Sequence, residues 1–224
     1  MNLNLMNKRI YLLALSGIIL YIVLIVIAMF TYPGGIRDNI SIVGYSFWGN
    51  TFSDLGRVTA WNGDPNPISM ILFSFAYGIH ATTMIFFYLV FMQKFEGEKL
   101  EGKTCKIGSF FGVLSSIAII GIIFTPADIF YVPHWIFVFI GYPSIFLMGL
   151  FYSITLFLSN YFSKNFSYIF TICLIVFFVA LLVGLIGISI SRTIMVIGQK
   201  IMRIALLIDL SILIYGAWKL EEKK

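Results

Sequence analysis

Six long apolar blocks divide this sequence, and they constrain its fold more than any motif does. The blocks lie at about 10–30, 68–92, 107–125, 135–158, 167–190 and 201–218. Each is long enough to cross a hydrocarbon core of about 30 Å as an α-helix. None alternates apolar and polar residues, as a transmembrane β-strand does. The sequence therefore predicts an all-α, polytopic membrane bundle, with residues 1–224 in one domain of six transmembrane helices.

The composition excludes a soluble domain. Hydrophobic residues make up 60% of the chain and charged residues only 11%, whereas about 25% is usual for charged residues in soluble proteins. The turns between the blocks at 93–106, 126–134, 159–166 and 191–200 are short. Only the stretch 31–67 is long and polar, so we expect a long outer loop between the first and second helices.

The basic residues predict the orientation. With the N-terminus in the cytoplasm, most lysines fall in cytoplasmic turns, and only Arg37, Arg57, Arg192 and Lys200 fall outside. Cytoplasmic turns are generally enriched in Lys and Arg. We therefore expect a multi-pass protein of the cell membrane with both termini cytoplasmic. The net charge of +5 then reflects lysines beside anionic headgroups, so the expected partners are membrane lipids and no nucleic acid.

Familiar metal, cofactor and nucleotide motifs are absent from the sequence. Two histidines exclude a three-histidine metal cage, and no H-E-x-x-H, G-x-S-x-G or Walker pattern occurs. The two cysteines, Cys105 and Cys173, fall in or near cytoplasmic-side segments and imply no disulfide framework. We therefore expect no cofactor and no metal, and the sequence leaves the oligomeric state open.

The outer segment contains the densest polar motif, GNTFSDLGR at residues 49–57. One interpretation is a lid that presents Ser53, Asp54 and Arg57 to a site at the outer membrane surface. The other is a capped turn in which Ser53 or Asp54 satisfies helix-end N–H groups and Arg57 pairs with Asp54 or a lipid phosphate. Flanking Gly, Pro and Asn residues predict tight turns at 32–35 and 62–65.

Two ionisable residues fall within the apolar blocks. By helical rise, His80 lies about 18 Å and Asp209 about 13 Å below the outer ends of their helices. An isolated carboxylate in hydrocarbon is costly, so Asp209 should face the bundle interior and find a donor, for which His80 is the candidate. Structural roles, in which each residue bonds a neighbouring backbone group, remain an alternative.

Two further outer turns carry chemistry. The run FTPADIFYVPHW at 124–135 places Asp128 and His134 on a turn stiffened by prolines, which suits either a general acid/base or metal site or an interfacial anchor. The turn at 191–200 holds Arg192 and Lys200, with Arg203 just inside the sixth helix. Such a basic cluster can hold a lipid phosphate or extend to the interface.

The run GNTFSDLG, the following Gly/Asn/Pro-rich turn with ISMILF, and P-A-D…P-H-W between the third and fourth helices resemble small six-span prokaryotic membrane proteins of unknown function. That group is distantly similar to the DRAM/Sfk superfamily, which includes eukaryotic proteins linked to GPI-anchor lipid remodelling and autophagy. The shared positions are Asn50, Ser53, Asp54, Gly56, Asn66, Ser69, Asp128 and His134. The resemblance implies that the outer motif belongs to a common site, but it brings no catalytic assignment.

The leading hypothesis is a polar outer-face pocket that binds or remodels a lipid or other amphipathic substrate. The catalytic candidates are Ser53, Asp54, His80, Asp128 and His134. The candidate substrate-binding residues are Asn50, Arg57, Arg192 and Lys200. In a hydrolytic or acyl-transfer version, the serine is the nucleophile, a histidine the general base, a carboxylate its orienting partner and an arginine the phosphate holder.

Two alternatives stay open. A small proton-coupled transporter would use His80 and Asp209 as a relay. A non-catalytic scaffold would use its polar residues only to hold the outer loop. Whether the protein is an enzyme is undecided at this level.

Overall fold

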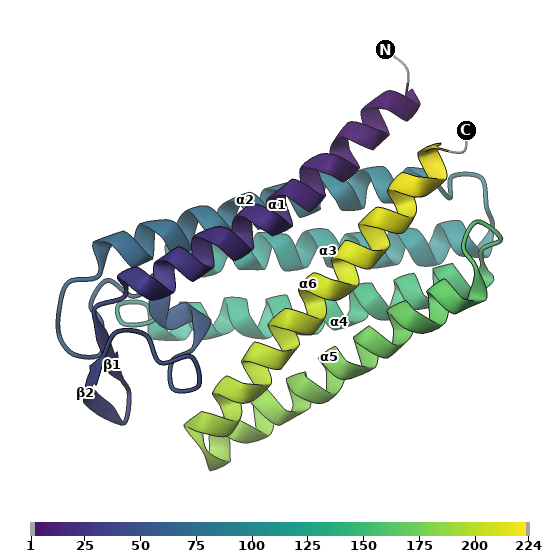
Figure 1. The fold of residues 1–224 in the computed structure, drawn as a ribbon. Helices are drawn as coiled ribbons and strands as arrows, with labels where there is room; N and C mark the ends of the chain where they lie inside the picture. Colours follow the sequence, from purple (N-terminus) through teal and green to yellow (C-terminus); the bar gives the residue numbers. More distant parts are fainter. Residues whose placement is uncertain (1–2, 223–224) are drawn as a thin grey trace.

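The chain forms six long helices in the computed structural model, which describes residues 3–222 (Figure 1). Their bounds are α1 Leu3–Thr31, α2 Pro67–Gln93, α3 Leu100–Phe124, α4 Tyr131–Leu158, α5 Lys164–Ile190 and α6 Arg192–Glu222. All six are long and apolar enough to cross a membrane. The predicted all-α bundle of six spans is confirmed, and the molecule is a multi-pass membrane protein.

The helices form a ring in chain order. Each helix packs on the next, and α6 returns to pack on α1, which closes the ring. Both chain ends lie at one end of the bundle, and a small β-hairpin lies at the other (Figure 1). We call these the termini end and the cap end.

The sixth helix departs most from expectation. The predicted turn at 191–200 is wrong, because α6 begins at Arg192, one residue after α5 ends. Arg192, Gln199 and Lys200 therefore lie on the first turns of a helix. Arg, Gln and Lys are good helix formers, and here their polar groups contact the segment before α2.

Glycines allow the closest helix contacts between α5 and α6. A Cβ added to Gly198 would lie 2.5 Å from the backbone nitrogen of Gly184, and one added to Gly187 would meet the Met195 backbone. Gly184 and Gly187 of α5 are therefore the positions at which the α6 backbone comes closest. The cap ends of α5 and α6 are thus held together backbone to backbone.

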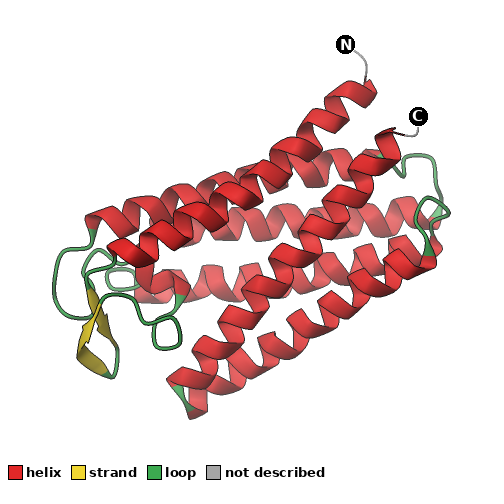
Figure 2. Ribbon diagram, in the orientation of Figure 1, coloured by secondary structure: helices red, strands yellow, loops and turns green. Residues whose placement is uncertain are grey.

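Residues 32–66, which we call the cap, join α1 to α2 and fold over the end of the bundle (Figure 2). They contain strands β1 Gly34–Ile36 and β2 Asn39–Val43, paired antiparallel, and the 3₁₀ helix η1 Phe52–Gly56. Gly35 lies at an irregularity of β1, has φ +81° and its added Cβ would lie 2.5 Å from Asn62 N, so this strand position requires glycine. The stretch predicted as a loop is therefore a compact folded element.

Candidate functional site

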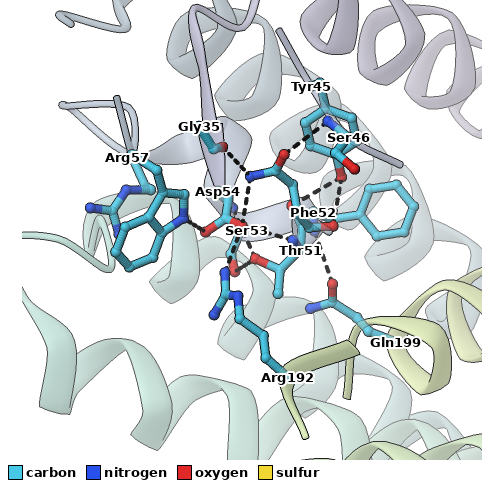
Figure 3. Close-up of polar contacts among 12 residues, drawn as sticks. Gly35, Tyr45, Ser46, Thr51, Phe52, Ser53, Asp54, Arg57, Arg192 and Gln199 are labelled. Carbon is cyan, nitrogen blue, oxygen red and sulfur yellow. Dashed lines mark hydrogen bonds and ion pairs between the residues drawn. The ribbon is translucent and has the colours of Figure 1, made fainter. Parts of the chain in front are cut away.

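Asp54 is the centre of a hydrogen-bond network that fastens the cap to α6 (Figure 3). Its Oδ2 accepts from Thr51 N at 2.8 Å, Asn50 Nδ2 at 3.3 Å and Arg192 Nη2 at 2.9 Å. Its Oδ1 accepts from Trp61 Nε1 at 2.9 Å. Three of the four donors share Oδ2 and one reaches Oδ1. The Asp54 carboxylate is therefore engaged in holding the cap on α6, and none of its partners in the described chain is a histidine.

The capped-turn interpretation of the 49–57 motif fits the geometry, but with different partners. Thr51 caps η1 and forms a capping box with Asp54. Ser53 caps nothing; its Oγ lies 3.1 Å from Thr51 Oγ1. The expected Arg57–Asp54 pair is replaced by Arg192–Asp54, because Arg57 stacks 3.8 Å over the Trp61 ring and donates to Thr59 O.

Asn50 also serves the fold of the cap. Its Nδ2 donates to Gly35 O at 2.9 Å, and its Oδ1 accepts from Ser46 N at 2.9 Å. The side chain thus joins the β-hairpin to the turn that precedes η1. Asn50 is fully buried, so its amide does not face a surface where a substrate would arrive.

Lys200 and Gln199 hold the cap from the side of α6. Gln199 Oε1 accepts from Phe52 N at 2.9 Å, and Lys200 Nζ donates to the Tyr45 hydroxyl and lies 3.6 Å over the Phe52 ring. Burial raises the pKa of Tyr45 well above its ordinary value. The hydroxyl therefore stays protonated and donates to Thr51 O at 3.0 Å. Lys200, proposed from sequence to bind substrate, is engaged by the cap.

The turn between α3 and α4 is tied to the cap and to itself. Asp128 accepts from Val58 N at 3.2 Å and Thr59 N at 2.9 Å, so it holds this part of the cap against the turn. His134 is buried at the start of α4, and its Nδ1 lies 2.7 Å from Thr125 O. Among the hydrogen bonds of residues 3–222, none joins Ser53, Asp54 or Asp128 to a histidine.

His80 and Asp209 are both buried within the bundle, as expected, but no hydrogen bond or ion pair between them occurs in residues 3–222. The charged neighbour of His80 is Arg203, and its ring lies 5.2 Å from that of Tyr21. Asp209 lies instead in the electrostatic neighbourhood of Tyr88 and Cys173. The proposed proton relay therefore lacks a direct contact.

A second polar group, which we call the arginine cluster, lies inside the ring of helices. Its members come from α1, α2, α4 and α6: Tyr21, Tyr77, His80, Tyr142 and Arg203. Arg203 Nη2 donates to the hydroxyls of Tyr77 at 3.2 Å and Tyr142 at 3.4 Å. Its guanidinium carbon lies 4.8–5.8 Å from the centroids of the three tyrosine rings. Arg203 is 1% exposed.

The cluster has unused hydrogen-bonding atoms. Within the described chain, no hydrogen-bond partner reaches Nε or Nη1 of Arg203 or Nδ1 of His80, and all three atoms are buried. The two ion pairs of residues 3–222 are Asp54–Arg192 and Lys94–Glu221, so neither involves Arg203. The cluster is thus a buried positive charge without a carboxylate partner.

The depth of the cluster is similar on each helix. Counting from the cap end, Tyr21, Tyr77, Tyr142 and Arg203 are ten or eleven residues along their helices, which is about 15–17 Å at 1.5 Å per residue. The middle of a hydrocarbon core of about 30 Å lies at that depth. From the sequence, Arg203 is expected just inside the sixth helix beside a basic turn, and the three tyrosines carry no prediction. The signal that was present is a tyrosine at matching depth in three different apolar blocks.

Comparison with known proteins identifies no relative: no protein-family model, no curated protein and no solved structure matches this chain.

Proposed function

We propose that this protein binds the negatively charged group of a ligand in the middle of the membrane, at the arginine cluster. The observation that carries the proposal is Arg203, a fully buried cation for which the described residues supply no anion. An arginine side chain is not deprotonated in proteins. Three tyrosine rings and two tyrosine hydroxyls offset part of this charge, and a bound anion would neutralise it.

The donors of the cluster suit a phosphate or a carboxylate. Arg203 has Nε and Nη1 unused, and the Tyr21 ring lies beside its guanidinium. Nε and Nη1 lie on different edges of the guanidinium, so each can donate one hydrogen bond to an anionic oxygen, such as that of a phosphate or a carboxylate. His80 Nδ1 can add a further donor if that nitrogen carries the proton.

The position favours a carrier over an enzyme. Substrate sites of membrane carriers lie near the bilayer midplane, and the unpaired cation is at that depth. The catalytic version of the outer-pocket hypothesis has less support, since Asp54 is engaged by cap and α6 donors and Ser53 lies beside a threonine. The DRAM/Sfk resemblance and the expected orientation stay predictions.

The proposal is tested by the response of the purified protein to small anions. Protein in a neutral maltoside detergent is titrated with ethyl phosphate and with propionate, and thermal unfolding is followed. We expect at least one anion to raise the unfolding midpoint of the wild type, because binding to the folded state alone stabilises it. The variant Arg203→Gln should lose this response.

Arg57→Gln is the matched control, since Arg57 lies on Trp61 in the cap, outside the cluster. It should respond to the anion as the wild type does. If folded Arg203→Gln responds equally to the anion, or if the wild type responds to neither, the proposed function is wrong.

A further inference from the structure

We infer that Asp209 binds a proton when the arginine cluster binds an anion, so that the protein takes up the two together. This inference rests on the proposed function and adds the ion to which binding of the anionic ligand is coupled. It gives Asp209 a role that requires no contact with His80.

Arg203 and Asp209 are the only Asp, Glu, Lys or Arg residues in the middle of the six helices, among residues 3–222. Every other residue of these four types in a helix is among the nine residues nearest to a helix end. Arg203 is the twelfth residue of α6, and Asp209 is the fourteenth from its other end. Lys200 comes closest to them, and the Tyr45 hydroxyl holds it in the cap. The middle of the bundle thus contains one cation and one carboxyl group.

The Asp209 side chain is buried without a cation beside it. It is 4% exposed, and no hydrogen-bond partner in the described chain reaches its Oδ1. Its titratable neighbours are Tyr88 of α2 and Cys173 of α5, whose phenol and thiol groups carry no charge at neutral pH. The helices α1 and α5 pack on α6, and their charged residues lie at the termini end: Lys8, Arg9 and Lys164. Since an unpaired carboxylate in hydrocarbon is costly, Asp209 is suited to accept a proton.

An anion at Arg203 changes the balance of charge around Asp209. The two residues are six positions apart on α6, which is about 9 Å along the helix axis. No ion pair joins them in the described chain, but opposite charges still interact over such a distance inside a protein. While the site is empty, Arg203 therefore favours the carboxylate form of Asp209. A bound anion cancels this attraction, and the carboxylate then takes up a proton.

Charge balance gives the stoichiometry. In the empty protein, the positive Arg203 and the ionised Asp209 sum to zero. A singly charged anion makes the sum negative, and one proton from the buffer restores zero by forming an O–H bond at Asp209. Nothing is oxidised or reduced. Because net charge is costly in hydrocarbon, the neutral arrangements are favoured, and anion and proton each strengthen the binding of the other. A carrier built in this way would move both in the same direction.

Isothermal titration calorimetry tests the inference. Purified protein in a neutral maltoside detergent is titrated with propionate or ethyl phosphate, whichever stabilises the wild type, in two buffers of different ionisation enthalpy. The difference in heat counts the protons taken up per anion bound. Between about pH 6 and pH 9, we expect the wild type to take up more protons than Asp209→Asn, by up to one per anion. At the highest pH, Asp209→Asn should bind the anion roughly ten-fold more tightly, since its amide does not repel an anion.

Glu222→Gln is the matched control, because it makes the same kind of change at an exposed carboxylate of α6. It should take up protons as the wild type does. Equal uptake by the wild type and Asp209→Asn at every pH would overturn the inference, and Asp209→Ser replaces the asparagine variant if that does not fold. If His80→Gln abolishes the uptake while Asp209→Asn retains it, the histidine accepts the proton and the inference is wrong.

The two proposals fail separately. If an anion binds through Arg203 without a proton that depends on Asp209, the anion site stands and the coupling falls. If neither anion binds, the proposed function falls and this inference falls with it.

Discussion

At the scale of residues, the polar side chains that hold the cap differ from Arg203 in the partners that they have. Asp54, Asn50 and Lys200 use their hydrogen-bonding groups inside the protein, and Arg192 pairs with Asp54 although its Nε has no partner in the described chain. Arg203 has no carboxylate partner among the described residues, although it is more deeply buried than Arg192. Groups that are fully satisfied stabilise a fold, whereas unsatisfied buried charge is costly and marks sites kept for function.

Asp54→Ala should therefore be strongly destabilising. The substitution leaves Arg192 without its carboxylate and frees the Thr51 and Trp61 donors. Loss of one partner from a buried ion pair costs about 3–5 kcal/mol, and thermal unfolding in detergent measures the loss. Ser53→Ala, which removes only a contact to Thr51, should cost about 1 kcal/mol or less; an equal loss in both variants would refute the structural role of Asp54.

Arg203→Met should have the opposite effect on stability. It removes a buried charge that lacks a carboxylate, and an apolar replacement of such a group is often neutral or stabilising by about 1–4 kcal/mol. The midpoint of unfolding without added anion should therefore be unchanged or higher. A clear fall would show that Arg203 holds the helices together, and Arg192→Met, which breaks an ion pair, supplies the comparison for such a fall.

At the scale of elements, α6 links the cap to the bundle. Its first turns bond the cap through Arg192, Gln199 and Lys200, and its last turn pairs Glu221 with Lys94 of the α2 end at 2.7 Å. The helix is thus held at both ends, with the arginine cluster between them. The α6 helix can pack this closely on α5 because Gly198 has no side chain.

Gly198→Leu should force α5 and α6 apart. The new side chain would meet the Gly184 backbone, which cannot move aside as a flexible side chain can. Overpacking typically costs about 1–3 kcal/mol, seen as a lower unfolding midpoint. Gly184→Ala is the control, because its Cβ would have no neighbour nearer than 3.9 Å, and alanine favours helix. Similar losses in both variants would contradict this account of the contact.

At the scale of the whole molecule, the cap and the chain ends lie at opposite ends of a closed ring of helices (Figure 1). The sequence predicts that the cap faces outward, because most lysines fall at the termini end. A cysteine at exposed Asp64 in a variant with Cys105 and Cys173 changed to serine should react with an impermeant maleimide in intact cells. A cysteine at exposed Glu96 should react only after permeabilisation; the reverse pattern would invert the orientation.

The amino-acid sequence alone determined the number of spans, the helical class and the tight turn at Gly63, because apolar run length and positive φ are local properties. The turn predicted at 32–35 is wrong, since Gly34 and Gly35 belong to strand β1. It also contained the capping box at Thr51 and Asp54, three residues apart. Only the tertiary structure decided that Asp54 pairs with Arg192, 138 positions away, rather than with Arg57. It alone brought Tyr21, Tyr77 and Tyr142 around Arg203. The physical reason is that hydrogen-bond partners within a bundle depend on how separate helices are rotated and placed, which no local pattern encodes.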